Sequence, residues 1–502
     1  MSALVPFHSG FARTLATAAL CAALGACVSV RVPKLPTGDL PPHWRHVETS
    51  PELGPSPDLT SWWKAFHDPE LNALVEQALA DNLNVKKAVW NLRAARALEA
   101  ASSTTFKPQL AFNTIEQPNP QNTASYFQAG FDATWELGLL GRSGANGHIA
   151  QAQSGAAEAE LQSARVSLVA EVVREYLALR AAQRSEALLD DAAQAAQGKV
   201  RLLEVQERLQ LASRLAVRQG EAAAAKAESQ IADPRAAIAQ HAQTLALLLG
   251  RSEPEPAWLK PAPLPRLADV DVDSVPANLL RTRPEIRYAE TQVLDAAGEL
   301  GIAKADLYPR LALGSSLTFA ALIKGHSRLG DINNSFAIGP IINIPLFDWG
   351  RRVAVRNART DQLQAALVAY RQAVLEGAAE VETDLASLDA SRQRLRGADA
   401  AAVATQGNLT LSEKLRGLGE ADGLQLADAR LALVASELDR EQARLAHGLA
   451  FVALYKALGG APLPASAEDG ACAATRPPNG GAPQGAPPAG CTDTTPARTA
   501  ER

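Results

Sequence analysis

The chain has 502 residues, of which 47% are hydrophobic, so it is long enough for two or three ordinary domains and can bury a large core. This content argues against an intrinsically disordered protein. The formal net charge is -5 at pH 7, and a mildly acidic chain argues against nucleic acid as the partner. Only 5% of the residues are aromatic, while Ala, Leu, Gln, Glu and Arg crowd the middle, a composition typical of long packed helices.

The first residues form a targeting segment. Arg13 precedes an apolar run over residues 14–26, which is shorter than the roughly 18 residues that a membrane-spanning helix needs. We therefore expect residues 1–26 to be a signal peptide that is removed. The run ends in Leu24-Gly25-Ala26-Cys27, which resembles a bacterial lipobox and predicts that Cys27 becomes the acylated first residue. The alternative is that Cys27 is simply another small apolar residue.

Acyl chains on Cys27 would hold the N-terminus in a membrane leaflet, because each buried methylene contributes about 0.8 kcal/mol. Val28 stands where an Asp would be the usual lipoprotein signal to stay in the inner membrane, so the resemblance favours the outer membrane. Apart from this N-acyl diacylglycerol lipid, no cofactor and no metal is predicted. Cys472 and Cys491 lie near the C-terminus, where an exported pair could form a disulfide or remain unpaired.

Two segments are predicted to lie outside the core. Residues 27–60 form an acylated linker whose many prolines indicate extended chain. We interpret His43 and His46 in this linker as solvated residues, because no further metal ligand lies nearby. Residues 461–502 are rich in Pro, Gly and Ala and are predicted to be disordered.

The region between these segments contains an internal duplication. The motif Phe-Lys-Pro-Gln-Leu-Ala-Phe at residues 106–112 returns about 200 residues later as Leu-Tyr-Pro-Arg-Leu-Ala-Leu at residues 307–313. Gly141-Arg142 likewise returns as Gly350-Arg351. The chain is therefore predicted to hold two copies of one plan.

Two alternating segments follow the proline motif in each copy, which predicts hairpins at about residues 107–137 and about residues 310–347. In the first hairpin, apolar and polar residues alternate from Phe127 to Leu137. In the second, Pro340 is expected to break the hydrogen-bonding ladder locally. Strands of about 9–11 residues with one apolar and one polar face suit a membrane β-barrel, although a single such hairpin would also suit a soluble protein. Two copies in an exported lipoprotein favour the barrel.

A very long proline-free stretch follows each hairpin, over residues 121–233 and 346–461, which predicts helices because proline disrupts helix interiors. Apolar residues in the second stretch recur at intervals of three and four, as in a coiled-coil seam. About 60 helical residues would reach roughly 90 Å, which favours a tube over a globular domain. The seam comprises Leu367, Tyr370, Val374, Ala378, Val381, Leu385 and Leu388, and further on Leu424, Ala427, Leu431, Val434 and Leu438.

Several motifs together resemble the outer-membrane factor family, and in particular its TolC-like, NodT-type lipoproteins, along nearly the whole mature chain. Trp62-Trp63 and Asp68-Pro69-Glu70 resemble the family's opening equatorial helix. Residues 135–142 resemble its strand-to-helix transition, although Gly138 and Leu140 replace the usual Asp and Phe. The second repeat opens and closes with two further matches, Leu279-Leu280-Arg281-Thr282-Arg283-Pro284-Glu285-Ile286 and Leu454-Tyr455-Lys456-Ala457-Leu458-Gly459-Gly460.

The resemblance implies an α+β membrane protein built from two repeats, residues 61–265 and 266–460. In such a homotrimer each chain gives four strands to one twelve-stranded transmembrane β-barrel, which stands on a long α-helical coiled-coil tunnel in the periplasm. Four strands alone would leave sheet edges exposed in lipid, so trimerisation is expected to be part of the fold.

The implied function is the outer-membrane channel of a tripartite efflux system, a passive exit duct that is gated at its periplasmic tip. The alternative is the outer-membrane channel of a type I protein secretion system or a metal-efflux system. The implied partners are a periplasmic adaptor protein, an inner-membrane RND-type pump reached through the adaptor, and the lipid of a Gram-negative outer membrane.

The resemblance also locates the gate. In the family a motif of the form Gly-x-x-Asp-x-Leu-x-x-x-Asp-Ala lies at the constriction, and residues 419–429 match it here. Leu424 and Asp428 are four residues apart, so they share a helical face and would form a leucine ring and a carboxylate ring on a threefold axis. Asp422 and Arg430 are candidate supports of this gate. The alternative is that Asp428 is an ordinary solvated residue.

The matching turn of the first copy would help to dock the adaptor, which makes Leu211, Ala212 and Ser213 candidate docking residues. Gln210 and Ala216 stand where the family usually has Gly and Asp, so the first copy departs from the pattern here.

An exported hydrolase and a coiled-coil spacer without a pore are the rival classes. A hydrolase would need a nucleophile with its base or a metal cluster, yet the histidines are scattered and neither Gly-x-Ser-x-Gly nor His-Glu-x-x-His occurs. We therefore predict no catalytic residue. The alternating strands argue against the spacer.

Overall fold

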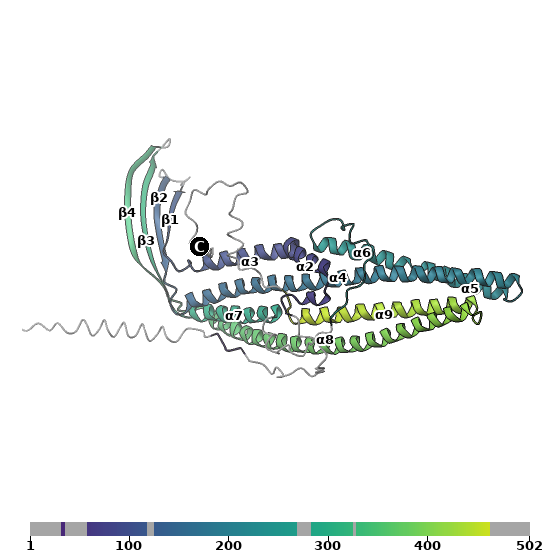
Figure 1. Ribbon diagram of the computed structural model, residues 1–502. Coiled ribbons are helices and arrows are strands. Elements are labelled where there is room, and N and C mark those ends of the chain that lie inside the picture. The colour runs from purple at the N-terminus through teal and green to yellow at the C-terminus, as the bar shows by residue number, and fades with distance from the viewer. Residues whose placement is uncertain (1–31, 36–57, 118–124, 269–282, 325–327, 462–502) are drawn as a thin grey trace, which may run out of the picture.

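The computed structural model describes residues 32–35, 58–117, 125–268, 283–324 and 328–461. A sheet lies at one end, and long helices run from it to the opposite end, where they turn back as two hairpins (Figure 1). Several predicted features lie outside the described residues: the signal peptide 1–26, Cys27, most of the linker 27–60, and all but the first residue of the tail 461–502.

The sheet is antiparallel, with the strand order β1-β2-β3-β4. Both predicted hairpins are confirmed, and pairing of β2 with β3 joins them. Pro340 lies opposite Leu313 in the edge strand β4 and does not shift the register, whereas an irregularity occurs between Ala321 and Ile323. The strands are β1 (Gln109–Gln117), β2 (Ser125–Glu136), β3 (Arg310–Lys324) and β4 (Arg328–Asn343).

The sheet has one apolar and one mostly polar or small face. Phe112 lies opposite Phe131 with ring centroids 5.0 Å apart, and the same face continues through Leu317 of β3 to Phe336 of β4. On the other face the Asn113 amide donates to Asp132 at 2.9 Å. Phe336 is 67% exposed, so the described part of the chain does not cover the apolar face. The alternation predicted for β2 is thereby confirmed, and the apolar face extends across all four strands, while Ile115 and Ile341 lie on the other face.

The predicted helices are present, and the two longest, α4 and α8, have 67 residues each. At 1.5 Å per residue each spans about 100 Å. In the first half, the segment that runs back from the tip is split into two helices, α5 and α6, because Pro234 in the first turn of α6 cannot donate a helical hydrogen bond. In the second half, the corresponding helix α9 is continuous. The first half contains η1 (Trp62–Phe66), α2 (Pro69–Asp81), α3 (Leu83–Ser102), α4 (Arg142–Arg208), α5 (Arg214–Ser229) and α6 (Ala232–Leu248), and the second half contains α7 (Pro284–Ala305), α8 (Arg351–Gly417) and α9 (Gly423–Ala457).

A pair of left-handed residues turns the chain from strand into long helix in both halves. Leu140 and Gly141 have φ of 59° and 82°, and Trp349 and Gly350 have φ of 56° and 79°. Glycine adopts this conformation without the steric cost of a Cβ atom, which explains why the motif returns at the same place in the element order.

Arg142, which follows Gly141, links the two halves of the chain through ion pairs. Arg142 forms ion pairs with Glu136 of β2 at 3.3 Å and with Asp306, which caps the end of α7, at 2.5 Å. Burial acts to raise the pKa of Asp306, but hydrogen bonds from Arg142 and Arg310 hold that pKa below its ordinary value. The junction between sheet and helices is therefore a charged network.

Halfway along the molecule, aromatic residues of η1 pack against aromatic residues near the end of α9. Trp62 is fully buried, and its indole N–H donates to the carbonyl of Gly460 at 3.0 Å. Its ring stacks on Tyr455 at 5.6 Å and meets Phe451 edge-on at 5.9 Å. The opening and closing motifs of the sequence thus form one aromatic core.

The predicted coiled-coil seam of α8 is confirmed by burial. Val381 is 1% exposed, and Tyr370, Val374, Leu385 and Leu388 are also buried. The helix packs against α7 and α9. Within the described residues, no helix is both long enough and apolar enough to cross a bilayer.

A half-buried carboxyl on α8 makes stability depend on pH. Arg283, which caps α7, binds Glu380 and the carbonyl of Gly377, and Asp384 lies one turn further along α8. Burial and the neighbouring Glu380 carboxylate raise the pKa of Asp384 to about 6 from 3.8, and Arg283 offsets this only in part. Because the folded-state pKa is the higher one, folding favours protonated Asp384, and stability falls as the pH rises from about 4 to 6.

We therefore expect Asp384→Asn to stabilise the protein by about 1 kcal/mol at pH 7.5, a value reduced for solvent screening, and to give no gain at pH 3.5. Thermal unfolding at both pH values measures this. Asp361→Asn, an exposed substitution on the same helix, is the control. Equal gains from Asp384→Asn at both pH values would contradict the assigned cause.

Candidate gate at the tips of the helical hairpins

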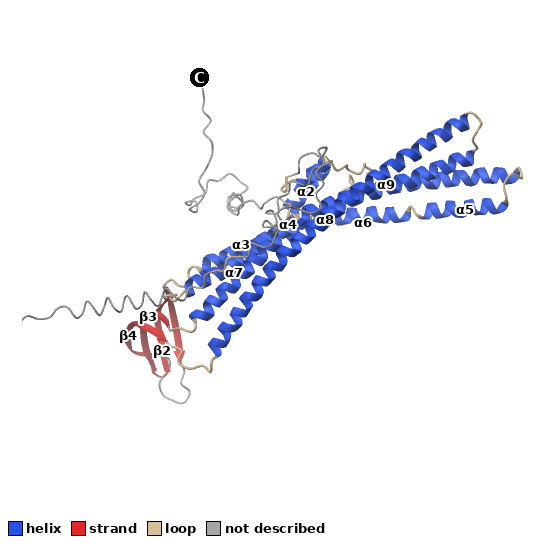
Figure 2. Cartoon of the chain, turned by 90° about the horizontal axis from the view of Figure 1, so that it is seen from below, coloured by secondary structure: helices blue, strands red, loops and turns tan. Residues whose placement is uncertain are grey.

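Two turns lie at the end of the molecule opposite the sheet (Figure 2). Residues 209–213 join α4 to α5, and residues 418–422 join α8 to α9. The segments predicted to form the gate and to dock the adaptor therefore lie at the same end of the chain's long axis.

The turn between α8 and α9 is set by a glycine and an aspartate. Gly419 has φ of 78°, the left-handed conformation that commonly ends a helix. Asp422 is the N-cap of α9, and its carboxylate accepts a hydrogen bond from the backbone N–H of Gln425 at 2.7 Å. Asp422, a predicted gate support, thus positions the first turn of the gate helix.

The two principal gate candidates occupy the first two turns of α9. Leu424 is half-buried, while the side chain of Asp428 is 57% exposed. Asp428 accepts a hydrogen bond from the ammonium of Lys199, on α4, at 2.5 Å. A Cβ atom on Gly423 would come within 2.9 Å of Leu202, so this end of α9 lies tightly against α4. The structure describes one chain, and the predicted rings of Leu424 and Asp428 remain predictions.

Arg430, the other predicted support, is directed to a different carboxylate. Its guanidinium lies 3.9 Å from Glu413 of α8, with both side chains about half exposed. Arg430 therefore links α8 to α9 loosely, and Lys199 is the base that Asp428 meets within the chain. The sequence did not reveal Lys199, because it lies 229 residues from Asp428 and belongs to no motif.

A cleft near the tip is lined by residues of α4, α8 and α9. Arg201, Arg416 and Arg430 line it, together with Asp191 and several apolar residues that include Leu202. Arginines thus outnumber carboxylates in its lining, and the local potential is expected to be positive.

The turn between α4 and α5 carries the docking candidates. Leu211 is 75% exposed, Ala212 is half-buried, and Ser213 caps α5 by accepting from the N–H of Ala216 at 3.2 Å. Gln210 has φ of 62°, so it adopts the left-handed conformation that Gly419 adopts in the other turn. The backbone bend is therefore kept although the glycine is absent, at a steric cost of about 1–2 kcal/mol.

Within the described residues, no three His, Cys, Asp or Glu side chains gather as a metal site. Cys27, the predicted lipid attachment point, lies outside them, and its acylation remains a prediction.

The capping role of Asp422 predicts that Asp422→Ala will fray the start of α9. Loss of the cap should cost about 1 kcal/mol and expose the amide of Gln425. Hydrogen exchange read by mass spectrometry should show faster exchange in the first turn of α9. Asp361→Ala, an exposed substitution inside α8, is the control and should leave the tip unchanged. Unchanged protection in Asp422→Ala would rule out the capping role.

Comparison with known proteins bears on these features. A family model described as outer membrane efflux protein matches residues 74–251 and again residues 275–460. The chain is 27% identical over 478 residues to the pyoverdine export outer membrane protein OpmQ of Pseudomonas aeruginosa, covering 89% of this chain and 97% of that protein. It is 26% identical over 412 residues to the toluene efflux pump outer membrane protein TtgC of Pseudomonas putida, covering 80% and 84% respectively.

Solved structures show the same fold. The outer-membrane channel OprN superposes with a TM-score of 0.74 at 28% identity, covering 87% of this chain and 100% of that one. The open state of the Neisseria gonorrhoeae MtrE outer membrane channel gives a TM-score of 0.72 at 25% identity, covering 87% and 99%.

Proposed function

Because the chain belongs to the outer membrane efflux protein family, we propose that three copies of it assemble into one exit duct across the periplasm and the outer membrane. The protein is an outer-membrane channel component of an efflux system. In the proposed assembly the duct is passive, and the cargo is whatever the inner-membrane pump delivers. Relatives named for pyoverdine and for toluene agree with a duct that does not itself select its cargo.

The main support for a trimer is the four-stranded sheet, which has two unpaired edges among the described residues and one exposed apolar face. Backbone groups at β1 and β4 find no strand partner among the described residues, and lipid offers none. Pairing β4 of one copy with β1 of the next satisfies these groups and closes a twelve-stranded barrel after three copies. The apolar face then meets lipid and the polar face lines the water-filled channel.

The helices would form the tunnel below the barrel. Each half of the chain supplies one helix of 67 residues, which supports the proposal of two repeats, residues 61–265 and 266–460. The long helices extend about 100 Å from the sheet, far enough to bring the tips deep into the periplasm.

At the tips, Leu424 and Asp428 would form the constriction, with Asp422 and Arg430 in support. The Lys199–Asp428 bridge joins α9 to α4 and would contribute to keeping the constriction closed. Exposed Leu211, with Ala212 and Ser213, would meet a periplasmic adaptor that links the duct to an inner-membrane RND-type pump.

The proposed barrel predicts different effects from two adjacent substitutions. Ala133→Arg on the apolar face should cost about 2–4 kcal/mol if that position lies near the bilayer midplane, because the charge enters lipid. Thr134→Arg on the polar face should be milder and is the matched control. The yield of heat-modifiable trimer in outer-membrane fractions measures insertion. Equal losses would contradict the assignment of the faces.

The proposed gate predicts separable effects on pore size and on selectivity. Leu424→Ala should raise single-channel conductance in planar bilayers and admit vancomycin from outside, because the narrowest ring becomes wider. Asp428→Ala should lower cation selectivity because it removes a ring of negative charge. Lys199→Gln should release α9 and raise conductance while cation selectivity is kept, because the carboxylates remain. If the double variant of Leu424 and Asp428 conducts as the parent does, these residues do not form the constriction.

Lipid anchoring at Cys27 predicts that Cys27→Ser will abolish labelling by palmitate and leave a precursor that is not cleaved at the lipobox. Membrane association should fall only in part, because the proposed barrel also inserts. Labelling of the Cys27→Ser protein at the level of the parent would refute acylation at this position, and Cys21→Ser, inside the signal peptide, is the control.

A further inference from the structure

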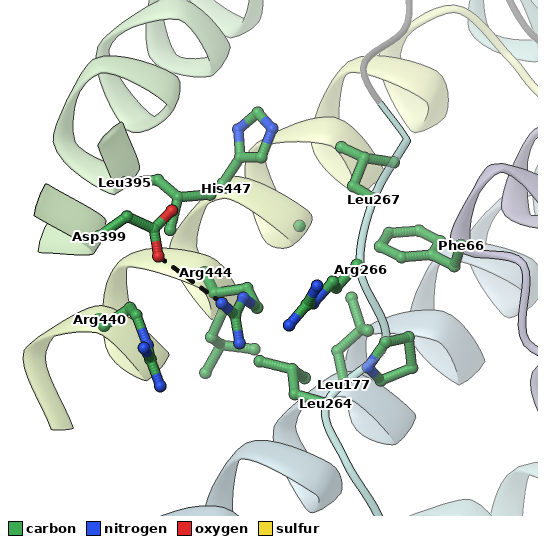
Figure 3. A pocket seen from close by; sticks show the side chains of 13 residues that line it. Phe66, Leu177, Leu264, Arg266, Leu267, Leu395, Asp399, Arg440, Arg444 and His447 are labelled. Atoms are coloured by element: carbon green, nitrogen blue, oxygen red, sulfur yellow. Dashed lines mark ion pairs between the residues drawn. The ribbon is translucent and has the colours of Figure 1, made fainter. Parts of the chain in front are cut away.

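A cavity of about 280 Å³ lies at the middle of the molecule, far from the tips and the sheet. Figure 3 shows it from close by. Arg440 and Arg444 reach it from α9, and Arg266 reaches it from the segment that follows α6. Figure 3 shows Arg266 and Arg444 facing one another across it, while Phe66 and Leu264 form part of an apolar wall. Three arginines thus line a space that is partly apolar.

These arginines have N–H donors that no group among the described residues accepts. Each guanidinium offers five N–H donors. Arg266 is an exposed residue and forms no ion pair or hydrogen bond with any residue in the described ranges, so only solvent competes for its donors. The buried Nε of Arg440 has no hydrogen-bond partner in the described structure, and its ion pairs to Glu437 and Glu441 are long, at 3.5 and 3.7 Å. A group that accepts several hydrogen bonds would stabilise this arrangement.

The nearby carboxylates leave room for such a group. Glu441 is 4% exposed and is held at 2.9 Å by Arg444, so it lies beneath the surface. Asp399 is the carboxylate among the cavity's lining residues, and it lies 3.7 Å from Arg444, beyond hydrogen-bonding distance. An entering anion would compete with this weak contact and with the long ion pairs of Arg440 to Glu437 and Glu441.

We propose that this cavity binds a small organic anion with an apolar body, such as an aromatic carboxylate. The carboxylate would take paired hydrogen bonds from Arg266 and Arg440, and the apolar part would lie against Phe66 and Leu264. The cavity volume suits a small molecule better than a peptide segment. This site is separate from the proposed gate. Its α9 residues lie in the second half of that helix, whereas Leu424 and Asp428 lie in the first two turns.

Equilibrium dialysis of 2-naphthoate against the full-length protein in lipid nanodiscs, with empty nanodiscs as background, tests the proposal. We expect saturable binding at one site per chain that weakens with added salt. The Arg266→Gln, Arg440→Gln double variant should bind about tenfold more weakly or worse. Arg218→Gln, an exposed arginine on α5 near the tips, is the matched control and should bind as the parent does.

A gain-of-binding variant separates the proposal from misfolding. Asp399→Asn removes the competing carboxylate and should bind 2-naphthoate several-fold more tightly. The cation 2-naphthylmethylammonium should not compete. Absence of saturable binding, equal competition by the cation, or unchanged binding in the double variant would overturn the proposal. Displacement of naphthoate by hexaglutamate at far lower concentrations would also overturn it, because the site would then favour an acidic peptide over a small anion.

Discussion

Unpaired backbone groups at the two edges of the sheet are the constraint on which the rest of this structure depends. The strands β1 and β4 each have one neighbour among the described residues, and the apolar face that they share is exposed. In water such a sheet would pair with strand edges of other chains and aggregate. In lipid each backbone N–H or C=O group without a hydrogen-bond partner would cost several kcal/mol. The left-handed pairs at Gly141 and Gly350 direct both long helices away from the sheet, so the edges stay clear of the chain's own helices. The proposed trimer pairs the strand edges and places the apolar face in lipid.

A second constraint acts halfway along the helices, where buried polar groups fix α4 in place. Arg180 is 1% exposed, yet it binds Glu70 of α2 at 2.7 Å and the carbonyl of Lys260 at 3.0 Å. Tyr176, one turn earlier, donates to Asp68 at 2.8 Å, and burial raises its pKa far above the ordinary value. Leaving a buried arginine without these partners would be strongly unfavourable. The network therefore fixes where α2 and the segment after α6 pack along α4. Helices of such length have few other features that would fix their register.

The sequence predicted the elements better than the contacts between them. Period-two alternation located both hairpins, and the absence of proline located the long helices, because each signal is local and repeated. Pro234 lay just beyond the proline-free stretch, so the split between α5 and α6 was not expected. Arg180 had no sequence signal either, since an arginine in an alanine-rich helix normally suggests a solvated face, and its partners come from residues far along the chain. The same reason hid Lys199, whose pairing with Asp428 depends on how α9 packs on α4.

The contacts at the tips are weaker than those at the middle, and this difference matters for a proposed gate. The Lys199–Asp428 pair has side chains that are 31% and 57% exposed, and the Arg430–Glu413 pair is longer and as exposed. Exposed pairs of this kind contribute about 0–1 kcal/mol each. The buried aromatic core around Trp62 and the Arg180 network resist movement far more strongly. A partner that binds the tips could therefore release α9 from α4 with a small part of its binding free energy, while the middle of the molecule stays fixed and acts as the point about which the hairpins bend.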